Sequence, residues 1–282
     1  MAASGISKEV PIISYPDHNS RIDVVTDEEP LEIWVAYKDN KEEFVELSLS
    51  ITMRTPGDDE ALVTGFLFSE GIIRSREDIE GIELFGPLTQ PYSLQNQIKV
   101  SLKSGERMAE KNFQRYFYSN SSCGVCGKAS IQALEMLHQP NIEKTGFTIH
   151  DQTLRQLPGQ LHLPQPEFEK TGGLHGVALV NRHGEILLTR EDIGRHNAMD
   201  KLIGQLIMED SMEMNDKMIL VSGRASFELV QKALIADIPC FASIGAPSSA
   251  AVDLANTFGL TLIGFLKENN YNIYNSAFRV VD

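Results

Sequence analysis

The chain has 282 residues, 42% of them hydrophobic, and its 39 acidic and 25 basic side chains give a formal net charge of −14. That length and apolar content suffice for one large domain or two smaller ones without disulfide support, and so negative a chain disfavours nucleic acid as its main partner. Because the sequence has no run of 18 apolar residues and does not open on a secretory or transit pattern, we expect a soluble, cytoplasmic protein that does not bind a membrane.

The first hundred residues predict a mixed region of strands and one helix. Residues 31–37, 44–53 and 96–102 carry β-branched and aromatic side chains in partial alternation, which is typical of strands. After a break at Pro56, three acidic residues open an apolar helical repeat that Gly71 ends. Because acids in a first turn interact favourably with the helix dipole, we expect these three to cap the helix rather than to catalyse.

The second half of the chain follows a different pattern. Residues 156–168, rich in proline and glutamine, predict a linker, and from residue 171 onward apolar strands alternate with amphipathic helices. Helices are expected at 196–209, 226–236 and 248–258. The strands expected around them are 176–180, 185–189, 218–221, 240–243 and 260–265. Such alternation implies crossover connections, so we predict an α/β half built on a largely parallel sheet that helices cover.

The turns that join these strands to helices hold many charged and hydroxyl side chains. Parallel strands would place the turns in 189–200, 221–228 and 243–253 at one sheet edge, where helix N-termini and glycines suit an anion. Ordinary α/β loops are built in the same way, and neither a G-x-G-x-x-G string nor a phosphate-binding P-loop string is present. We nevertheless predict a pocket for a phosphate-bearing small molecule. Its candidate contacts are His175, Arg195, His196, Ser222, Gly223, Arg224 and Ser248.

Two of the three cysteines, Cys123 and Cys126, stand close together in the string SSCGVCGKAS. The N-terminus of a helix that we expect to begin near Lys128 would lower the pKa of both thiols. The short polar segment around them is expected to be exposed and mobile. Cys240 lies in an apolar strand and is expected to be a small buried hydrophobe. The sequence therefore predicts two reactive thiols and one inert thiol.

Three kinds of chemistry fit the spacing of the reactive thiols. One is a thioredoxin-like redox pair, although the surrounding order of elements differs from that fold. Another is a zinc site that His175, His183 or His196 completes. Residues 183–185 form the H-x-E string of zinc deaminases, but here it follows the cysteines instead of preceding them, and it also suits a hairpin turn. The third is sulfur carriage, in which one thiolate holds sulfur as a persulfide and the other helps to release it.

A resemblance to one family favours sulfur carriage. The strings that carry it are RTPGDDEALVTGFLFSEGII, SSCGVCGKAS, TGGLHGVAL, REDIGRHNAMDKLIG, SGRASFELVQKA and APSSAAVDLA. They occur in the same order in the formate dehydrogenase accessory sulfurtransferases, the FdhD family, which this chain resembles from about residue 20 to its end. Because several long strings stay in register, the resemblance is far more specific than the thiol spacing alone.

The resemblance implies a sulfurtransferase that takes sulfur from a cysteine desulfurase as a persulfide. It then passes the sulfur to the molybdenum cofactor, in its bis-guanine-dinucleotide form, for the catalytic subunit of formate dehydrogenase. Cys123 matches the persulfide-bearing cysteine of the family and Cys126 its second thiol. The segment that matches the family's cofactor contact comprises Phe265, Leu266, Lys267, Glu268, Asn269 and Asn270. Lys267 stands where arginine is expected, which removes a planar two-pronged grip on phosphate.

The resemblance also implies a cytidine-deaminase-like three-layer core, a homodimer and no permanently bound metal. We therefore predict an α/β fold in which residues 21–282 form one family-level domain after an N-terminal extension, 1–20. Within it we expect a smaller mixed β/α region, 21–118, a mobile CxxC loop, 119–127, and an α/β cofactor-binding region, 128–282. A cofactor-binding chaperone without sulfur turnover and, less readily, a thiol-disulfide oxidoreductase stay open as alternatives.

Overall fold

The computed structural model describes residues 7–90, 94–110, 140, 142, 146–161, 166–210 and 213–282. The expected thiol loop, 119–127, lies outside the described residues together with Cys123 and Cys126, and so does the start of the helix expected near Lys128. Within the described ranges, no helix combines the length and the apolar character that a membrane span needs.

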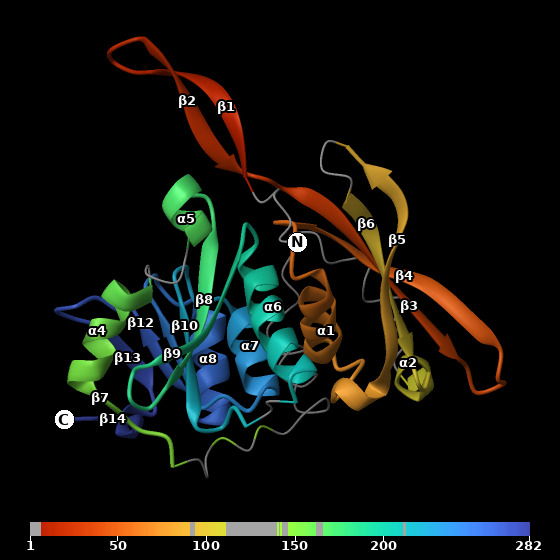
Figure 1. Ribbon diagram of the computed structural model, residues 1–282. Coiled ribbons are helices and arrows are strands. Elements are labelled where there is room, and N and C mark those ends of the chain that lie inside the picture. The colour runs from red at the N-terminus through yellow and green to blue at the C-terminus, as the bar shows by residue number, and fades with distance from the viewer. Residues whose placement is uncertain are drawn as a thin grey trace.

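Two sheets organise the described residues (Figure 1). The four-stranded sheet has the order β4-β3-β6-β5, and the six-stranded sheet has the order β13-β12-β11-β10-β8-β9. The strands of the first are β3 (Glu29–Lys38), β4 (Phe44–Arg54), β5 (Ile79–Thr89) and β6 (Leu94–Leu102). Those of the second are β8 (His175–Asn181), β9 (Ile186–Asp192), β10 (Lys217–Val221), β11 (Cys240–Ser243), β12 (Thr261–Gly264) and β13 (Asn272–Asn275). Two smaller pairs are β1 (Ser7–Ser14) with β2 (Asn19–Thr26), and β7 (Ile149–His150) with β14 (Val280–Val281).

Helices separate and cover the sheets. They are α1 (Asp59–Ser69), α2 (Glu106–Glu110), α4 (Asp151–Leu161), α5 (Pro166–Thr171), α6 (Arg195–Met208), α7 (Phe227–Ile235) and α8 (Ser249–Phe258), with short 3₁₀ turns at Arg76–Asp78 and Ala277–Arg279. One apolar cluster joins the inner face of the four-stranded sheet to α1, α6, α7, α8 and one face of the six-stranded sheet. The other face of that sheet packs on α4 in a second cluster. The described chain is thus layered as sheet, helices, sheet and helix.

Glycines allow α1 and α6 to cross at very short range in the middle layer. A Cβ atom on Gly65 would lie 1.9 Å from the carbonyl oxygen of Asp200, and one on Gly204 would lie 1.8 Å from that of Ala61. Both distances are far below van der Waals contact, so only glycine fits at either position. The crossing fixes α6 against the N-terminal half of the chain.

The prediction of a largely parallel six-stranded sheet is wrong. Only β10, β11 and β12 run parallel to one another, whereas β8, β9 and β13 run antiparallel to their neighbours. The connections explain the difference. A tight turn over residues 181–185 joins β8 to β9, and residues 265–271 join β12 to β13 without a helix. Both are too short for the crossover that a parallel pair requires.

The prediction of a linker at 156–168 is also wrong, because α4 extends through Leu161 and α5 begins at Pro166. Pro158 lies inside α4 and removes a backbone hydrogen bond from it. Leu154, Leu157 and Leu161 nevertheless recur at helical spacing and are almost fully buried against the sheet. Their burial outweighs the lost bond, which the local composition alone does not reveal.

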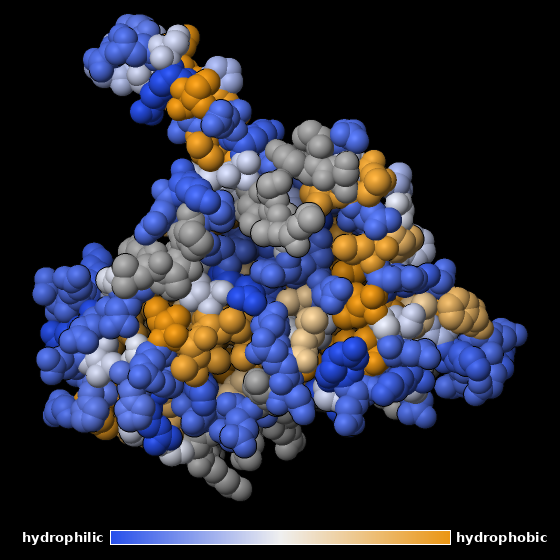
Figure 2. All heavy atoms as spheres, in the orientation of Figure 1, coloured by the Kyte–Doolittle hydropathy of each residue, from blue (hydrophilic) through white to orange (hydrophobic). Residues whose placement is uncertain are grey.

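The N-terminal extension forms a hairpin that sequence reasoning did not predict. Strands β1 and β2 project away from the rest of the fold, and apolar side chains show on this arm in Figure 2. Ile13 and Ile22 there are 65% and 61% exposed. The arm joins the body where the Thr26 hydroxyl donates to the Thr171 hydroxyl at 2.8 Å. The boundary predicted after residue 20 therefore falls inside β2.

Substituting Gly204→Ala should destabilise the protein. The new methyl group would meet the Ala61 carbonyl, so α1 and α6 must separate, and we expect the free energy of unfolding to fall by about 2 kcal/mol despite the better helix propensity of alanine. Urea denaturation measures the change. Gly81→Ala is the matched control because nothing lies within 4 Å of its Cβ position. Equal stability of both variants would contradict the close crossing.

Candidate functional site

Five chain segments meet at one edge of the six-stranded sheet. The parallel strands β10, β11 and β12 all end there. Because β8 is antiparallel to β10, it begins at the same edge, and the pairing of β8 with β9 places His175 opposite Asp192, where β9 ends. The three strand-to-helix turns identified in the sequence are thus brought together with His175 and with the segment after β12. Antiparallel pairing has not dispersed them.

Backbone hydrogen bonds tie these segments to one another. Ser222 N donates to Gly176 O at 2.9 Å, and the Ser222 hydroxyl accepts from Gly176 N at 3.0 Å. Gly245 N donates to Gly223 O at 3.1 Å, and Phe265 N donates to Gly245 O at 3.0 Å. The chain of contacts runs from β8 to the segment after β12, so the edge is a continuous and preformed surface.

The N-termini of α7 and α8 lie side by side at this edge. Ala225 and Pro247, just ahead of the two helices, form a parallel bridge. Hydroxyl groups cap both helices: Ser226 Oγ accepts from a backbone N–H of α7, and Ser248 Oγ accepts from one of α8. Helix N-termini carry partial positive charge and free N–H groups, so two adjacent ones favour an anionic ligand.

Arg195 adds a fixed positive charge at the start of α6. Its side chain is half-buried, and its Nε is buried without a hydrogen-bond partner among the described residues. A buried donor without a partner is costly unless a ligand or water satisfies it. Arg224, at the neighbouring turn, is exposed, and its backbone and side-chain stem lie close to Gly245. Arg195 therefore offers a ligand a cation in a fixed orientation, and Arg224 offers one whose side chain can adapt.

The two histidines at the edge differ in environment. Burial lowers the pKa of His175 from its ordinary value, the charges of Arg195 and His196 lower it further, and Asp192 partly opposes them. His196 Nε2 lies 2.8 Å from a carboxylate oxygen of Glu228, and this hydrogen bond lowers the pKa of Glu228. We infer that His175 faces the edge as a neutral donor or acceptor. The pair of the half-buried His196 and the exposed Glu228 contributes little to stability.

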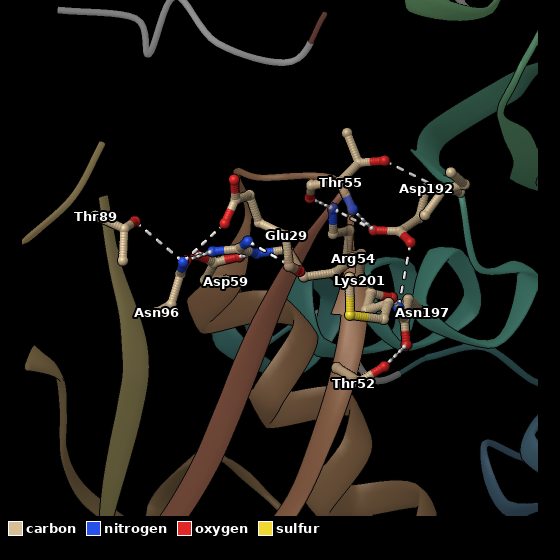
Figure 3. Close-up of polar contacts among 12 residues, drawn as sticks. Glu29, Thr52, Arg54, Thr55, Asp59, Thr89, Asn96, Asp192, Asn197 and Lys201 are labelled. Atoms are coloured by element: carbon tan, nitrogen blue, oxygen red, sulfur yellow. Dashed lines mark hydrogen bonds and ion pairs between the residues drawn. The ribbon is translucent and has the colours of Figure 1, made fainter. Parts of the chain in front are cut away.

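A buried polar network, which sequence reasoning missed, fixes the N-terminus of α6 (Figure 3). The fully buried carboxylate of Asp192 accepts from Lys201 Nζ at 2.7 Å, from Gly194 N at 2.8 Å and from Thr55 N at 3.1 Å. Lys201 also donates to Thr55 O at 2.8 Å. The network therefore binds the end of β4 to the turn that presents Arg195. Because Thr55 is more than a hundred positions away in the sequence, no local signal predicts the contact.

The segment 265–270 is exposed at every residue but Leu266. Leu266 is fully buried, so its side chain packs in the second apolar cluster rather than facing the edge. Phe265 has a positive φ of 55° and is 43% exposed. The side chains of Lys267, Glu268, Asn269 and Asn270 are exposed on a turn that Lys267 N closes by donating to Asn270 O at 2.9 Å. Of this segment, all but Leu266 are therefore available to a ligand.

Residues 183–185 lie apart from this edge. They form the turn between β8 and β9, as the alternative hairpin interpretation predicted, with Gly184 at a φ of 81°. The seven residues of β8 separate His183 from His175 by about 20 Å. His183 therefore cannot share a metal with the edge histidines. Among the described residues, no group of three or more His, Cys, Asp or Glu side chains is placed to hold a metal ion.

Cys240 behaves as the sequence predicted. It is fully buried in β11, and burial raises the pKa of its thiol to about 12. A thiol that stays protonated at neutral pH is a poor nucleophile, so Cys240 is inert. Of the three cysteines, Cys240 is therefore not a candidate nucleophile.

The chain is similar to proteins of one family over nearly its whole length. The FdhD/NarQ family model matches residues 26–281. A protein of Streptomyces coelicolor named sulfur carrier protein FdhD is 42% identical over 264 residues, which cover 93% of this chain and 90% of that protein. A protein of the same name from Mycobacterium tuberculosis is 42% identical over 265 residues, with 93% of each chain covered. One from Picrophilus torridus is 40% identical over 276 residues, with 98% of each chain covered.

A solved structure shares the fold. It is titled "Crystal structure of a putative formate dehydrogenase accessory protein from Desulfotalea psychrophila". It superposes with a TM-score of 0.68 at 23% identity, over 98% of this chain and 99% of that one. At this level of identity the match supports the fold alone.

Removing the positive charge of Arg195 should raise the pKa of His175. The Arg195 guanidinium disfavours protonation of that imidazole, so Arg195→Met favours the charged ring. NMR titration of the His175 ring protons measures the change. Arg182→Met, which removes a cation beyond the far end of β8, is the control and should leave the titration unaltered. If both variants titrate like the parent protein, Arg195 does not act on His175.

Proposed function

Because this chain belongs to the FdhD/NarQ family, we propose that it is a sulfur carrier that serves the maturation of formate dehydrogenase. The observation that carries the proposal is 42% identity, over 93% of the chain, with proteins named sulfur carrier protein FdhD. In the proposed activity, sulfur arrives from a cysteine desulfurase and leaves on the molybdenum cofactor in its bis-guanine-dinucleotide form. The protein is then a persulfide sulfurtransferase, and the cofactor is its substrate.

The proposed sulfur chemistry uses Cys123 and Cys126, which lie outside the described residues. The Cys123 thiolate attacks the outer sulfur of a persulfide on the desulfurase, and the desulfurase thiolate leaves, so the sulfur moves without a net oxidant. Attack of the Cys126 thiolate on the inner sulfur of Cys123 then forms a disulfide and releases the carried sulfur as sulfide. A cellular thiol reduces this disulfide before the next cycle. Cys240 takes no part, since its pKa is raised to about 12.

The sheet edge supplies the groups that we propose hold the cofactor. Its two guanine nucleotides carry phosphates, which suit the adjacent N-termini of α7 and α8. The Nε of Arg195, which has no partner in the part of the chain that the structure describes, provides an oriented donor, and Arg224 provides a second cation. Gly223 and Gly245 have no side chains to obstruct a large ligand that approaches the backbone. The residues present therefore fit a bulky, phosphate-rich anion.

Further parts of the proposal come from the family. They are a cytidine-deaminase-like core, a homodimer, action in the cytoplasm, and contacts with a cysteine desulfurase and with the catalytic subunit of formate dehydrogenase. Helices on both faces of the six-stranded sheet support the first of these. Lys267 offers charge to the ligand without the two-pronged geometry of arginine, so we propose a looser phosphate contact at that position.

Sulfur loading should depend on Cys123. After incubation with a cysteine desulfurase and free cysteine, mass spectrometry of the parent protein should show one added sulfur atom on Cys123 that a reductant removes. Cys123→Ala should abolish the addition, whereas Cys240→Ala should retain it because Cys240 is buried. Parent protein that gains no sulfur would instead favour a chaperone that binds the cofactor without sulfur turnover.

Arg195→Met should impair ligand binding rather than sulfur loading. We expect it to weaken binding of guanosine diphosphate by about tenfold or more, because a charge-assisted contact to phosphate is lost, and to leave sulfur loading unchanged. Isothermal titration calorimetry and the mass-spectrometric assay measure the two properties. Arg182→Met serves again as the control. Unaltered affinity in Arg195→Met would place the phosphate site elsewhere.

A further inference from the structure

A second polar cluster lies beside the candidate site, on the opposite face of the six-stranded sheet from α7 and α8. It comprises Asp151 and Arg155, one turn apart on α4, and Tyr271, which ends the segment after β12. Neither sequence reasoning nor the family resemblance assigns these residues a role. They contact the connection whose exposed turn is the proposed cofactor contact.

The cluster converges on one carboxylate. The Asp151 oxygens accept two hydrogen bonds from the Arg155 guanidinium, each at 2.9 Å, and a third from the Tyr271 hydroxyl at 2.5 Å. Arg155 also donates to the backbone carbonyl of Asn269 at 3.5 Å, and its guanidinium lies 5.9 Å from the centre of the Tyr271 ring. The Arg155 side chain thus contacts both the exposed turn, at Asn269, and Tyr271, which follows the turn.

The other end of the turn is held differently. Phe265 N and Leu266 N donate to the carbonyls of Gly245 and Ser243, and the Leu266 side chain is fully buried. Between this apolar anchor and Tyr271, the side chains of residues 267–270 are all exposed. The exposed turn is therefore fixed by packing and backbone bonds before it, and by the α4 cluster after it.

We propose that Asp151, Arg155 and Tyr271 are positioning residues that hold the turn 267–270 in its ligand-binding conformation, and thereby set the affinity for the guanine-nucleotide substrate. The inference rests on the proposed function, because it assumes that this turn contacts the cofactor. It assigns α4 a role beyond covering the sheet. Held only at its Leu266 end, the exposed turn would sample many conformations, and ordering it on binding would cost affinity.

The polar contacts can be separated from the packing. Tyr271 also packs against the second apolar cluster. Tyr271→Phe keeps the ring and removes only the hydroxyl that reaches Asp151. Tyr274→Phe is a matched control. It removes the same hydroxyl group from a residue of β13 that packs against the first apolar cluster, on the other face of the sheet. If Tyr271 acts only through the packing of its ring, both variants should bind guanosine diphosphate as the parent protein does.

Calorimetric titration of the full-length protein with guanosine diphosphate tests the proposal. We expect Tyr271→Phe to bind about three- to tenfold more weakly than the parent protein, and Tyr274→Phe to bind equally well. Hydrogen exchange at the amide of Lys267, which bonds to Asn270 O, should accelerate in Tyr271→Phe while the midpoint of global unfolding stays unchanged. Asp151→Ala should weaken guanosine diphosphate binding at least as much as Tyr271→Phe does. The double variant should lose no more affinity than Asp151→Ala alone.

The outcomes separate this inference from the function on which it rests. If the parent protein binds no guanosine diphosphate, the proposed ligand site fails and the inference falls with it. If the parent binds but Tyr271→Phe binds equally well, with unaltered exchange at Lys267, the inference alone is overturned. Additive losses from Asp151→Ala and Tyr271→Phe would likewise show that the two residues do not act through one contact.

Discussion

The structure depends on the buried carboxylate of Asp192. An ionised group without water is tolerated only when a counter-ion and hydrogen bonds satisfy it, and Lys201, Thr55 N and Gly194 N do so here. Removing one partner from such a buried pair typically costs about 3–5 kcal/mol. The carboxylate stands at the end of β9, and its partners come from β4 and α6. One interaction therefore joins the two halves of the chain at the point where the candidate site begins.

Helix α6 transmits this constraint through the fold. Its N-terminus is fixed by Asp192, its middle crosses α1 through Gly65 and Gly204, and its apolar residues belong to the cluster that reaches both sheets. Asp200, on the same helix, binds Lys232 of α7 at 2.7 Å. Because α7 begins at the sheet edge, the position of its N-terminus depends on α6 as well. The edge that forms the candidate site is thus positioned by a helix that contributes few of its candidate contact residues.

Local patterns predicted many of the helices and strands but not how the strands are arranged. The strand at 240–243 and the three helices after residue 194 were predicted to within a few residues, because apolar runs and hydroxyl caps are short-range signals. The direction of the strands was not predicted, because it depends on the lengths of the connections between β8 and β9 and between β12 and β13. Helix α4 was obscured by Pro158, whose cost is offset only by burial against a distant sheet. The turns of the candidate site were recognised from their composition, but the contacts of Asp192 with Thr55 and of Asp151 with Tyr271 join residues too distant in sequence for any local pattern to reveal.

The same buried pair explains how an acidic protein can present a cationic edge. With a net charge of −14, the chain as a whole repels anions, so a phosphate-bearing substrate needs a site where positive charge is both local and unopposed. Asp192 lies at this edge, two residues ahead of Gly194 and opposite His175, where its negative charge alone would oppose a cationic surface. Lys201 cancels it from inside the protein. The guanidinium of Arg195 and the dipoles of α7 and α8 then keep the edge cationic, although the exposed carboxylate of Glu228 lies nearby and pairs with His196. A lysine buried inside the protein thus helps to set the field at its surface.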